Sequence, residues 1–220
     1  MEIFPPPRRT RLAVWPLLAG AIVAALLAAP SSDAQAATPA PEGEGTRTVR
    51  RANTSVQELL REKAEPGSPA EKKLAGQVTR SVRDFLDIDT LGQRAMRDHW
   101  GKLGAAQRRD FLQLLRDLVE ANYIKALRAN LNYEVKYVGE TPEGDQLLVK
   151  TEVVAQRHGR PHSIEIDYLL MREGGTWRAF DVVTDGVGLV DNYRAQFNKI
   201  IARDGVAGLL DRMRKKRAKM

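Results

Sequence analysis

The sequence predicts an α+β fold: a twisted antiparallel sheet of four strands covered by a layer of helices. Apolar residues recur at helical spacing between residues 48 and 129, and they alternate with polar residues between residues 133 and 183. The connections between the four alternating segments are short, which favours an antiparallel meander. Helices followed by strands, in a chain of 220 residues, are typical of the α+β class.

Residues 1–36 have the layout of a secretory signal peptide. Arginines within residues 8–11 form a basic head, residues 12–29 are apolar, and Ala34-Gln35-Ala36 provides a cleavage site with small residues. An uncleaved membrane anchor is the alternative, and a proline and a glycine within the apolar run disfavour it. The pair Arg8-Arg9 leaves both Sec and twin-arginine export open. The chain has no cysteine, so it relies on no disulfide bond. We expect a periplasmic protein.

The mature chain begins with a linker and two helices. Residues 37–47 are rich in proline, glycine and glutamate, and they are predicted to be a disordered linker. Residues 48–63 carry a helical apolar stripe. Ser68-Pro69 starts a second helix that runs to about residue 86, with Glu71 completing a capping box.

Two further helices complete the helical part. Asp87 or Asp89 is expected to cap a third helix that continues to Trp100. Residues 105–129 are predicted to form the longest helix because they carry a wide apolar face opposite a charged one, with Glu120 on the charged side.

The four predicted strands begin with alternating tyrosine and valine at residues 133–137 and end with residues 177–183. Turn sequences at residues 141–145, 157–161 and 173–175 separate them. The two central strands have the clearest apolar sets: Leu147, Val149, Thr151 and Val153, then Ile164, Ile166, Tyr168 and Leu170.

The fourth strand leads through a glycine-rich elbow into a last long helix. Gly186 and Gly188 supply backbone freedom at the elbow, and Asp191 is expected to cap the helix. Gly205 is predicted to break it and to start a short final helix. Three polar residues of its first turns should fasten this helix by hydrogen bonds: Asn192, Arg194 and Gln196. Two aromatic residues of the same turns, Tyr193 and Phe197, should face inward.

The net charge of +7 is concentrated at the C-terminus. Residues 48–211 are predicted to be one folded domain, and residues 212–220 a basic tail. The tail can attract an anionic membrane or a partner, or it can be a solvated helix end. Its cations are Arg212, Arg214, Lys215, Lys216, Arg217 and Lys219. Nucleic acid is not an expected partner of an exported protein.

Signatures of catalysis and metal binding are missing from the sequence. It has no G-x-S-x-G motif and no cysteine nucleophile, and its Gly186-Val187-Gly188 does not extend to a dinucleotide fingerprint. His158 and His162 are four residues apart, but Pro161 precludes the helix that would pair them as metal ligands. Asp181, Asp185 and Asp191 surround the elbow, where capping explains them better than acid–base chemistry. We expect a protein that is not an enzyme and has neither a metal nor a cofactor.

A helical layer on a sheet can pack solidly or leave an apolar cavity. Six large aromatic residues are suited to rim such a cavity, although their spacing alone favours core positions. They are Tyr133, Tyr137, Tyr168, Trp177, Tyr193 and Phe197. The residues by themselves therefore lead to an exported α+β binding module.

The C-terminal stretch resembles the signature of MlaC-type periplasmic phospholipid-binding proteins, the toluene-tolerance auxiliary family. The resemblance rests on Gly186-Val187-x-Leu189-Val190-x-Asn192-Tyr193-Arg194-x-Gln196-Phe197, followed by Gly205-x-x-Gly208-Leu209. Phe85-x-x-Ile88-Asp89 through Trp100, and then Gln107-x-x-x-Phe111, are similar to the central helices of that family. The basic tail after Leu210 lies outside the common core of the family.

The resemblance implies a monomeric carrier that holds a phospholipid as cargo in an apolar cavity between the sheet and the helices. Such a carrier shuttles the lipid between an outer-membrane lipoprotein complex and an inner-membrane ABC transporter with a membrane-anchored lipid-binding subunit. Together with the strand alternation, the resemblance implies that six residues line the cavity: Leu147, Val149, Ile164, Ile166, Tyr168 and Leu170. Four further residues are expected to close it: Val187, Leu189, Tyr193 and Phe197.

The alternative is an exported small-molecule-binding or catalytic domain on a cone-shaped α+β fold like that of nuclear-transport-factor relatives. Such a domain needs titratable side chains inside its sheet. Glu165 and Asp167 alternate away from the apolar face, which disfavours this alternative.

Overall fold

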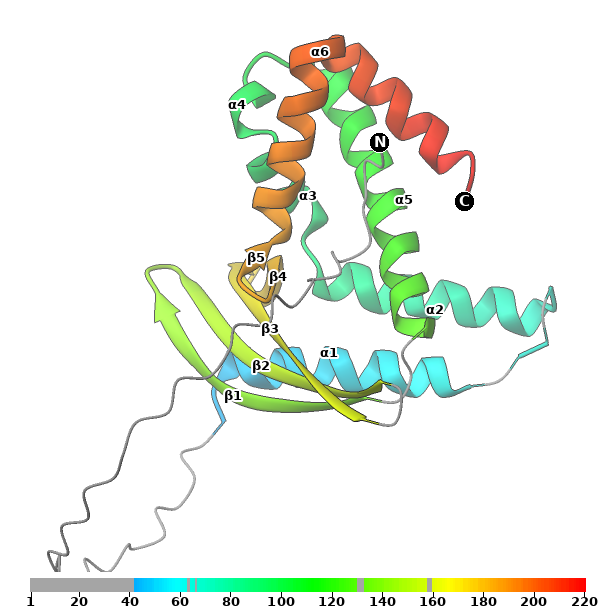
Figure 1. The fold of residues 1–220 in the computed structure, drawn as a ribbon, viewed down its shortest axis with the longest axis vertical. Helices are drawn as coiled ribbons and strands as arrows, with labels where there is room; N and C mark the ends of the chain where they lie inside the picture. The colour runs from blue at the N-terminus through cyan, green and yellow to red at the C-terminus, as the bar shows by residue number, and fades with distance from the viewer. Residues whose placement is uncertain (1–41, 63, 66, 130–132, 158–159) are drawn as a thin grey trace, which may run out of the picture. The chain divides into compact units, whose positions relative to one another are not determined.

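An antiparallel sheet with the strand order β1-β2-β3-β4-β5 organises the described part of the chain (Figure 1). Each strand pairs with the next along the chain, so the predicted meander is confirmed. The strands are β1 (Tyr133–Glu143), β2 (Gln146–Arg157), β3 (Arg160–Glu173), β4 (Thr176–Thr184) and β5 (Val187–Gly188).

The computed structural model describes residues 42–62, 64–65, 67–129, 133–157 and 160–220. The expected signal peptide and the first part of the expected linker, residues 37–41, lie outside these residues. Glu42–Met220 form one compact unit, which includes residues 42–47 of the expected linker and the whole basic stretch 212–220.

The fifth strand replaces the open elbow that the sequence predicts. Asp185 and Gly186 have φ angles of 48° and 79°, as the two central residues of a type I′ hairpin turn require. Thr184 therefore pairs with Val187, and Val183 with Gly188. A strand of two residues is too short to show alternation, so sequence reasoning missed it.

Six helices accompany the sheet in the described residues, and none of them is long and apolar enough to cross a membrane. The predicted third helix is divided in two at Met96, whose φ and ψ are −97° and 10°. The Met96 side chain is fully buried, so packing at this point overrides the helical pattern. The helices are α1 (Glu44–Arg61), α2 (Pro69–Phe85), α3 (Ile88–Ala95), α4 (Arg97–Trp100), α5 (Ala105–Ala129) and α6 (Leu189–Arg217).

The local caps predicted for α2 and α3 are present. Ser68 Oγ accepts a hydrogen bond from the backbone N–H of Glu71 at 3.1 Å. The carboxylate of Asp87 accepts one from the N–H of Thr90 at 3.0 Å. Asp89, the other candidate, instead forms an ion pair with Arg116 of α5.

Helix α1 begins inside the stretch that the sequence predicts as linker. Glu140 of β1 accepts hydrogen bonds from the backbone N–H of Thr46 at 2.6 Å and from its hydroxyl at 2.9 Å. It thereby satisfies an N–H of the first helical turn, which Gly43 at the N-cap cannot do without a side chain. The helix starts early because its cap comes from the sheet.

Helix α6 changes direction at Gly205, whose φ of 67° is not helical, as the sequence predicts (Figure 1). The basic stretch continues this helix as far as Arg217 and does not form a separate tail. Arg214 forms an ion pair with Asp110 of α5, and Arg217 forms one with Asp117 of α5. The paired residues occur in the same order along the two helices. Ion pairs between these helices hold the C-terminal segment alongside α5.

The helical core lies between α3, α5 and α6. Phe111 of α5 packs edge-to-face on Phe197 of α6, with ring centroids 5.5 Å apart. Gly92 of α3 allows the close approach of α5, because a Cβ there would lie 2.6 Å from Leu115 Cδ2. Glu120, predicted to be on the charged side of α5, is buried because Arg83 of α2 holds it in a two-bond ion pair.

Candidate functional site

The predicted cavity residues of the two central strands share one face of the sheet. In the register of β2 and β3, four pairs lie directly opposite one another: Leu147 and Leu170, Val149 and Tyr168, Thr151 and Ile166, Val153 and Ile164. Directly opposed residues point to the same side of an antiparallel sheet. Helix α1 covers this side, because a Cβ on its Gly45 would lie 3.0 Å from both Leu147 and Val149. We call it the inner face.

Burial on the inner face changes along the strands. Leu147, Val149, Tyr168 and Leu170 are buried, with exposed fractions of 9%, 0%, 6% and 0%. Tyr168 is packed edge-to-face against Phe85 of α2 at 5.6 Å. Beyond Thr151 the apolar residues of the same face are only half-buried; these are Val135, Val153, Ile164 and Ile166. The inner face thus consists of a packed half and a half that retains accessible apolar surface.

Two of the four residues predicted to close a cavity lie within the helical core. Tyr193 and Phe197 are buried within the helical core, where their rings stack at 5.6 Å and Phe197 contacts Phe111. Val187 pairs with Thr184, which pairs with Ile166, so Val187 lies on the inner face, where it is 60% exposed. Leu189 is half-buried. Tyr193 and Phe197 do face inward, as expected, but the contacts described for them are with helices α5 and α6.

The N-terminus of α6 is held by Asp181 of β4, and not by Asp191 as the sequence predicts. Asp181 Oδ1 accepts hydrogen bonds from the N–H groups of Val190 at 3.1 Å and Val182 at 2.8 Å. Burial raises the pKa of Asp181, and the backbone donors oppose this rise. Asp191 is exposed in the first helical turn and forms an ion pair with Arg194. The buried carboxylate has a structural role here.

Glycine at position 188 is explained by space and not by conformational freedom. Its φ is −75°, which any residue can adopt. A Cβ at this position would lie 2.8 Å from Oδ2 of Asp181. Asp181 pairs with Leu169, so it belongs to the face opposite Tyr168. Helix α6 is therefore anchored away from the inner face.

Polar side chains fasten α6 to the helices beside it. Arg194 donates to the carbonyl of Arg94 in α3 at 3.3 Å, so the predicted fastening is confirmed for this residue. Gln196 donates to Asn192 at 2.8 Å, a bond within α6 that does not join it to another element. Sequence reasoning missed Asn198, which donates to Asp98 and bonds to His99 Nε2 at 2.9 Å. The hydrogen bond from Asn198 lowers the pKa of Asp98.

Two aromatic residues at the sheet edges, Tyr137 and Trp177, contact α1. The ring of Tyr137 lies 3.9 Å from the guanidinium carbon of Arg50, and its hydroxyl accepts a hydrogen bond from Asn53 at 3.3 Å. Burial raises the pKa of Tyr137. Trp177 donates its indole N–H to Glu44 at 3.0 Å. Tyr133, Tyr137 and Trp177 are half-buried, as residues at a rim would be.

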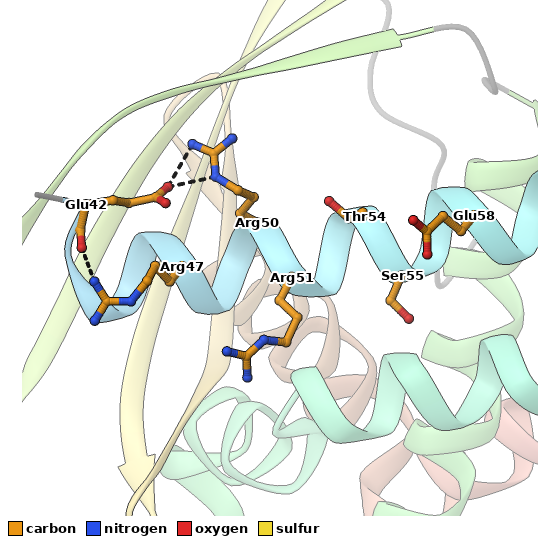
Figure 2. A pocket seen from close by; sticks show the side chains of 7 residues that line it. All are labelled: Glu42, Arg47, Arg50, Arg51, Thr54, Ser55 and Glu58. Atoms are coloured by element: carbon orange, nitrogen blue, oxygen red, sulfur yellow. Dashed lines mark hydrogen bonds and ion pairs between the residues drawn. The ribbon is translucent and has the colours of Figure 1, made fainter. Parts of the chain in front are cut away.

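Two surface hollows are lined by described residues. One, of about 400 Å³, follows the exposed side of α1 and is lined by Arg47, Arg50, Arg51 and their neighbours (Figure 2). The other, of about 480 Å³, lies beside the β1–β2 and β3–β4 turns, next to Leu147 and Trp177. Leu147 is the one predicted cavity residue that lines either of them.

Within the part of the chain that the structure describes, no group of three or more histidine, aspartate or glutamate side chains could hold a metal ion. The side chains of His158 and His162 lie outside that part. His99, the remaining histidine, bonds to Asn198 between α4 and α6.

Comparison with known proteins identifies the family. The sequence model of the family described as "MlaC protein" matches residues 50–215, most of the chain. The chain belongs to the MlaC family. The match includes residues 212–215, so the expectation that the family's core ends at Leu210 is wrong. This agrees with the packing of the C-terminal segment of α6 against α5.

Two related proteins illustrate the family. The chain is 21% identical over 138 residues to the intermembrane phospholipid transport system binding protein MlaC of Haemophilus influenzae. This match covers 62% of the chain and 64% of that relative. The fold is similar to that of a phospholipid-binding protein from Ralstonia solanacearum solved in complex with a phospholipid. The TM-score is 0.66 at 22% identity, over 80% of this chain and 98% of the other.

Proposed function

We propose that this chain is a periplasmic carrier that binds a phospholipid against its inner face and transfers it between membranes without breaking a bond. Membership of the MlaC family supports the proposal, as do the names of the two related proteins. The observation that carries it in this chain is the accessible apolar half of the inner face. Ile164 and Ile166 lie on the covered side of the sheet and yet are only half-buried.

An apolar surface of this kind matches what a lipid carrier requires. Each methylene buried is worth about 0.8 kcal/mol, so a two-chain lipid leaves a bilayer at a cost on the order of 25 kcal/mol. Only an equally apolar site can offset that cost. We propose that Ile164 and Ile166 contact the acyl chains, and that Leu147, Val149, Tyr168 and Leu170 form the packed floor beside them. Tyr193 and Phe197 then support the helical layer and do not line the lipid site. Val187 continues the row of Ile166 on the inner face and is a candidate contact for the lipid, while Leu189 lies beside it at the start of α6.

The proposed route runs between an outer-membrane lipoprotein complex and an inner-membrane ABC transporter with a membrane-anchored lipid-binding subunit. Export by the N-terminal signal peptide would place the carrier between the two membranes, where it acts as a monomer. The C-terminal cations are a candidate for attraction to an anionic membrane or partner. Ion pairs within the described residues already involve Arg212, Arg214, Lys215 and Arg217, which leaves Lys216 and Lys219 as the stronger candidates.

Lipid extraction from the purified protein, followed by mass spectrometry, tests binding. A stoichiometric phospholipid is expected in protein produced in a bacterial host and purified without detergent. A transfer assay between donor and acceptor vesicles that carry a fluorescent phospholipid tests the carrier step. If no lipid is recovered and no transfer occurs, the chain is not a carrier.

A further inference from the structure

Three arginines on the exposed side of α1 form a cationic surface next to the inner face. Arg47, Arg50 and Arg51 line the hollow of about 400 Å³ together with two hydroxyl residues (Figure 2). A guanidinium group presents a planar fork of N–H donors that matches phosphate oxygens in a bidentate way. The charged and hydroxyl side chains that line this hollow suit a phosphate group better than an apolar ligand.

Arg50 connects this hollow to the inner face. Its guanidinium lies over the ring of Tyr137, whose hydroxyl is held by Asn53. Tyr137 lies directly opposite Thr151, and Thr151 directly opposite Ile166. Tyr137, Thr151 and Ile166 thus form one row across the strands, and the inner face changes from buried to half-buried at this row. Arg50 lies at the β1 end of the row.

An anionic oxygen already occupies the binding position of Arg50. Glu42 Oε1 lies 2.8 Å from Nε and 2.7 Å from Nη2 of Arg50 (Figure 2). Both side chains are well exposed, at 50% for Arg50 and 33% for Glu42, and exposed ion pairs are weak. A phosphate group can replace this carboxylate without loss of a strong interaction. Glu42 and Glu58 also line the hollow, so its excess of positive charge is small.

We propose that Arg50 binds the phosphate group of the phospholipid whose acyl chains lie against Ile166. Arg47 donates to the backbone carbonyl of Glu42 on the other side of that residue and adds positive charge nearby (Figure 2). This inference rests on the proposed function. The phosphate stays at the solvent-exposed side of α1 while the chains enter between α1 and the sheet. Free phosphate is the other source of the same chemistry.

Calorimetric titration of lipid-free protein separates these cases. The ligands are a short-chain phosphatidylglycerol, the diacylglycerol with the same chains, and inorganic phosphate. Wild-type protein should bind the phospholipid about tenfold more tightly than the diacylglycerol, as expected for one lost charge-assisted contact. Arg50→Gln should bring this ratio close to one and leave the affinity for diacylglycerol unchanged. Inorganic phosphate alone should not bind measurably.

Control variants keep the test falsifiable. Arg61→Gln removes the same charge from the last turn of α1, outside the hollow, and should keep the tenfold ratio. Arg50→Lys retains the charge without the fork and should give an intermediate ratio, even if Arg50→Gln unfolds. An unchanged ratio in Arg50→Gln, or binding of inorganic phosphate with equal affinity, would overturn the phosphate site alone. Binding of neither lipid by wild-type protein would instead overturn the proposed function.

Discussion

The carboxylate of Asp181 lies in the space that a side chain on Gly188 would need. A Cβ on Gly188 would be 2.8 Å from Oδ2 of Asp181, while Oδ1 of the same group accepts the N–H of Val190. The end of the sheet and the start of α6 are thus joined by one buried carboxylate. This joint replaces the hinge of flexible glycines that the signature sequence would predict.

Gly188→Ala should destabilise the protein by about 1–3 kcal/mol, because overpacking forces Asp181 away from the helix terminus. Urea denaturation measures the change. Gly76→Ala is the matched control: Gly76 lies within α2 with nothing within 4 Å of a new Cβ. This control should stabilise the protein by about 0.5–1 kcal/mol, since alanine is the better helix former. Equal effects of the two variants would contradict the steric explanation.

Asp181→Asn should change how stability depends on pH. Burial raises the pKa of Asp181 in the folded state above its ordinary value of 3.8. The native state therefore holds a proton that the unfolded state releases, and the stability contributed by this group falls as the pH rises through the folded pKa. The free energy of unfolding of wild type minus that of Asp181→Asn should decrease from pH 4 towards neutrality. A difference that grows with pH would refute this; the exposed Asp191→Asn serves as the control.

Glu140→Ala should cost about 1–2 kcal/mol, because Thr46 loses the acceptor of its backbone N–H. The loss should be local, with faster hydrogen exchange in the first turn of α1. Glu134→Ala, on the same strand but exposed and directed to the other face, should change stability by less than about 0.5 kcal/mol. If exchange in α1 is unaffected by Glu140→Ala, then the helix does not depend on this cap.

Ile166→Trp should reduce bound phospholipid at least about tenfold, since the larger ring fills the accessible half of the inner face. Quantitative mass spectrometry of extracted lipid is the measurement, and thermal melting confirms that the variant is folded. Glu165→Trp, one residue away on the opposite face, should retain its lipid. Full lipid occupancy in a folded Ile166→Trp variant would place the lipid elsewhere.

Lys216→Gln with Lys219→Gln should weaken binding to anionic vesicles by about fivefold per lysine, because each cation near such lipids is worth about 1 kcal/mol. Sedimentation with vesicles containing phosphatidylglycerol measures this. Lys72→Gln with Lys73→Gln removes the same charge from α2 and should have less effect. Deletion of residues 212–220 is a poorer test, because Met213 is buried and its loss would destabilise α6. Equal vesicle binding by all variants would show that the C-terminal cations serve the fold alone.

The elements that local sequence could predict are those whose causes lie within one helical turn or one strand. Ser68 caps α2 through a residue three positions away, and Gly205 bends α6 by its own conformation. The alternation within β2 and within β3 likewise indicates which of their residues form the inner face. The missed features depend on residues that only the fold brings together. Glu140 caps α1, Asp181 caps α6, and Arg178 of β4 caps the end of α2 by donating to the carbonyls of Arg83 and Leu86.

The candidate site also combines features that local sequence could predict with features that depend on the fold. Alternation indicated that Ile164, Ile166, Tyr168 and Leu170 share a face, and the register confirms it. Which of them stay accessible depends on where α1 and α2 cover the sheet, and periodicity carries no information about that. Tyr193 and Phe197 have the spacing of inward residues, but the partner that Phe197 faces, Phe111, is set by the packing of α5 on α6.

The bond between Thr46 and Glu140 also has a consequence for the order of folding. The two residues are 94 positions apart, and closing a loop of that length costs on the order of 4 kcal/mol of chain entropy. Helix α1 leaves the ribosome before the described strands, yet its first turn lacks this cap until β1 has been made and has folded onto it. Contacts over such separations slow folding. Helix α1 is the first of the described helices to be synthesised, and it is therefore among the last to be finished.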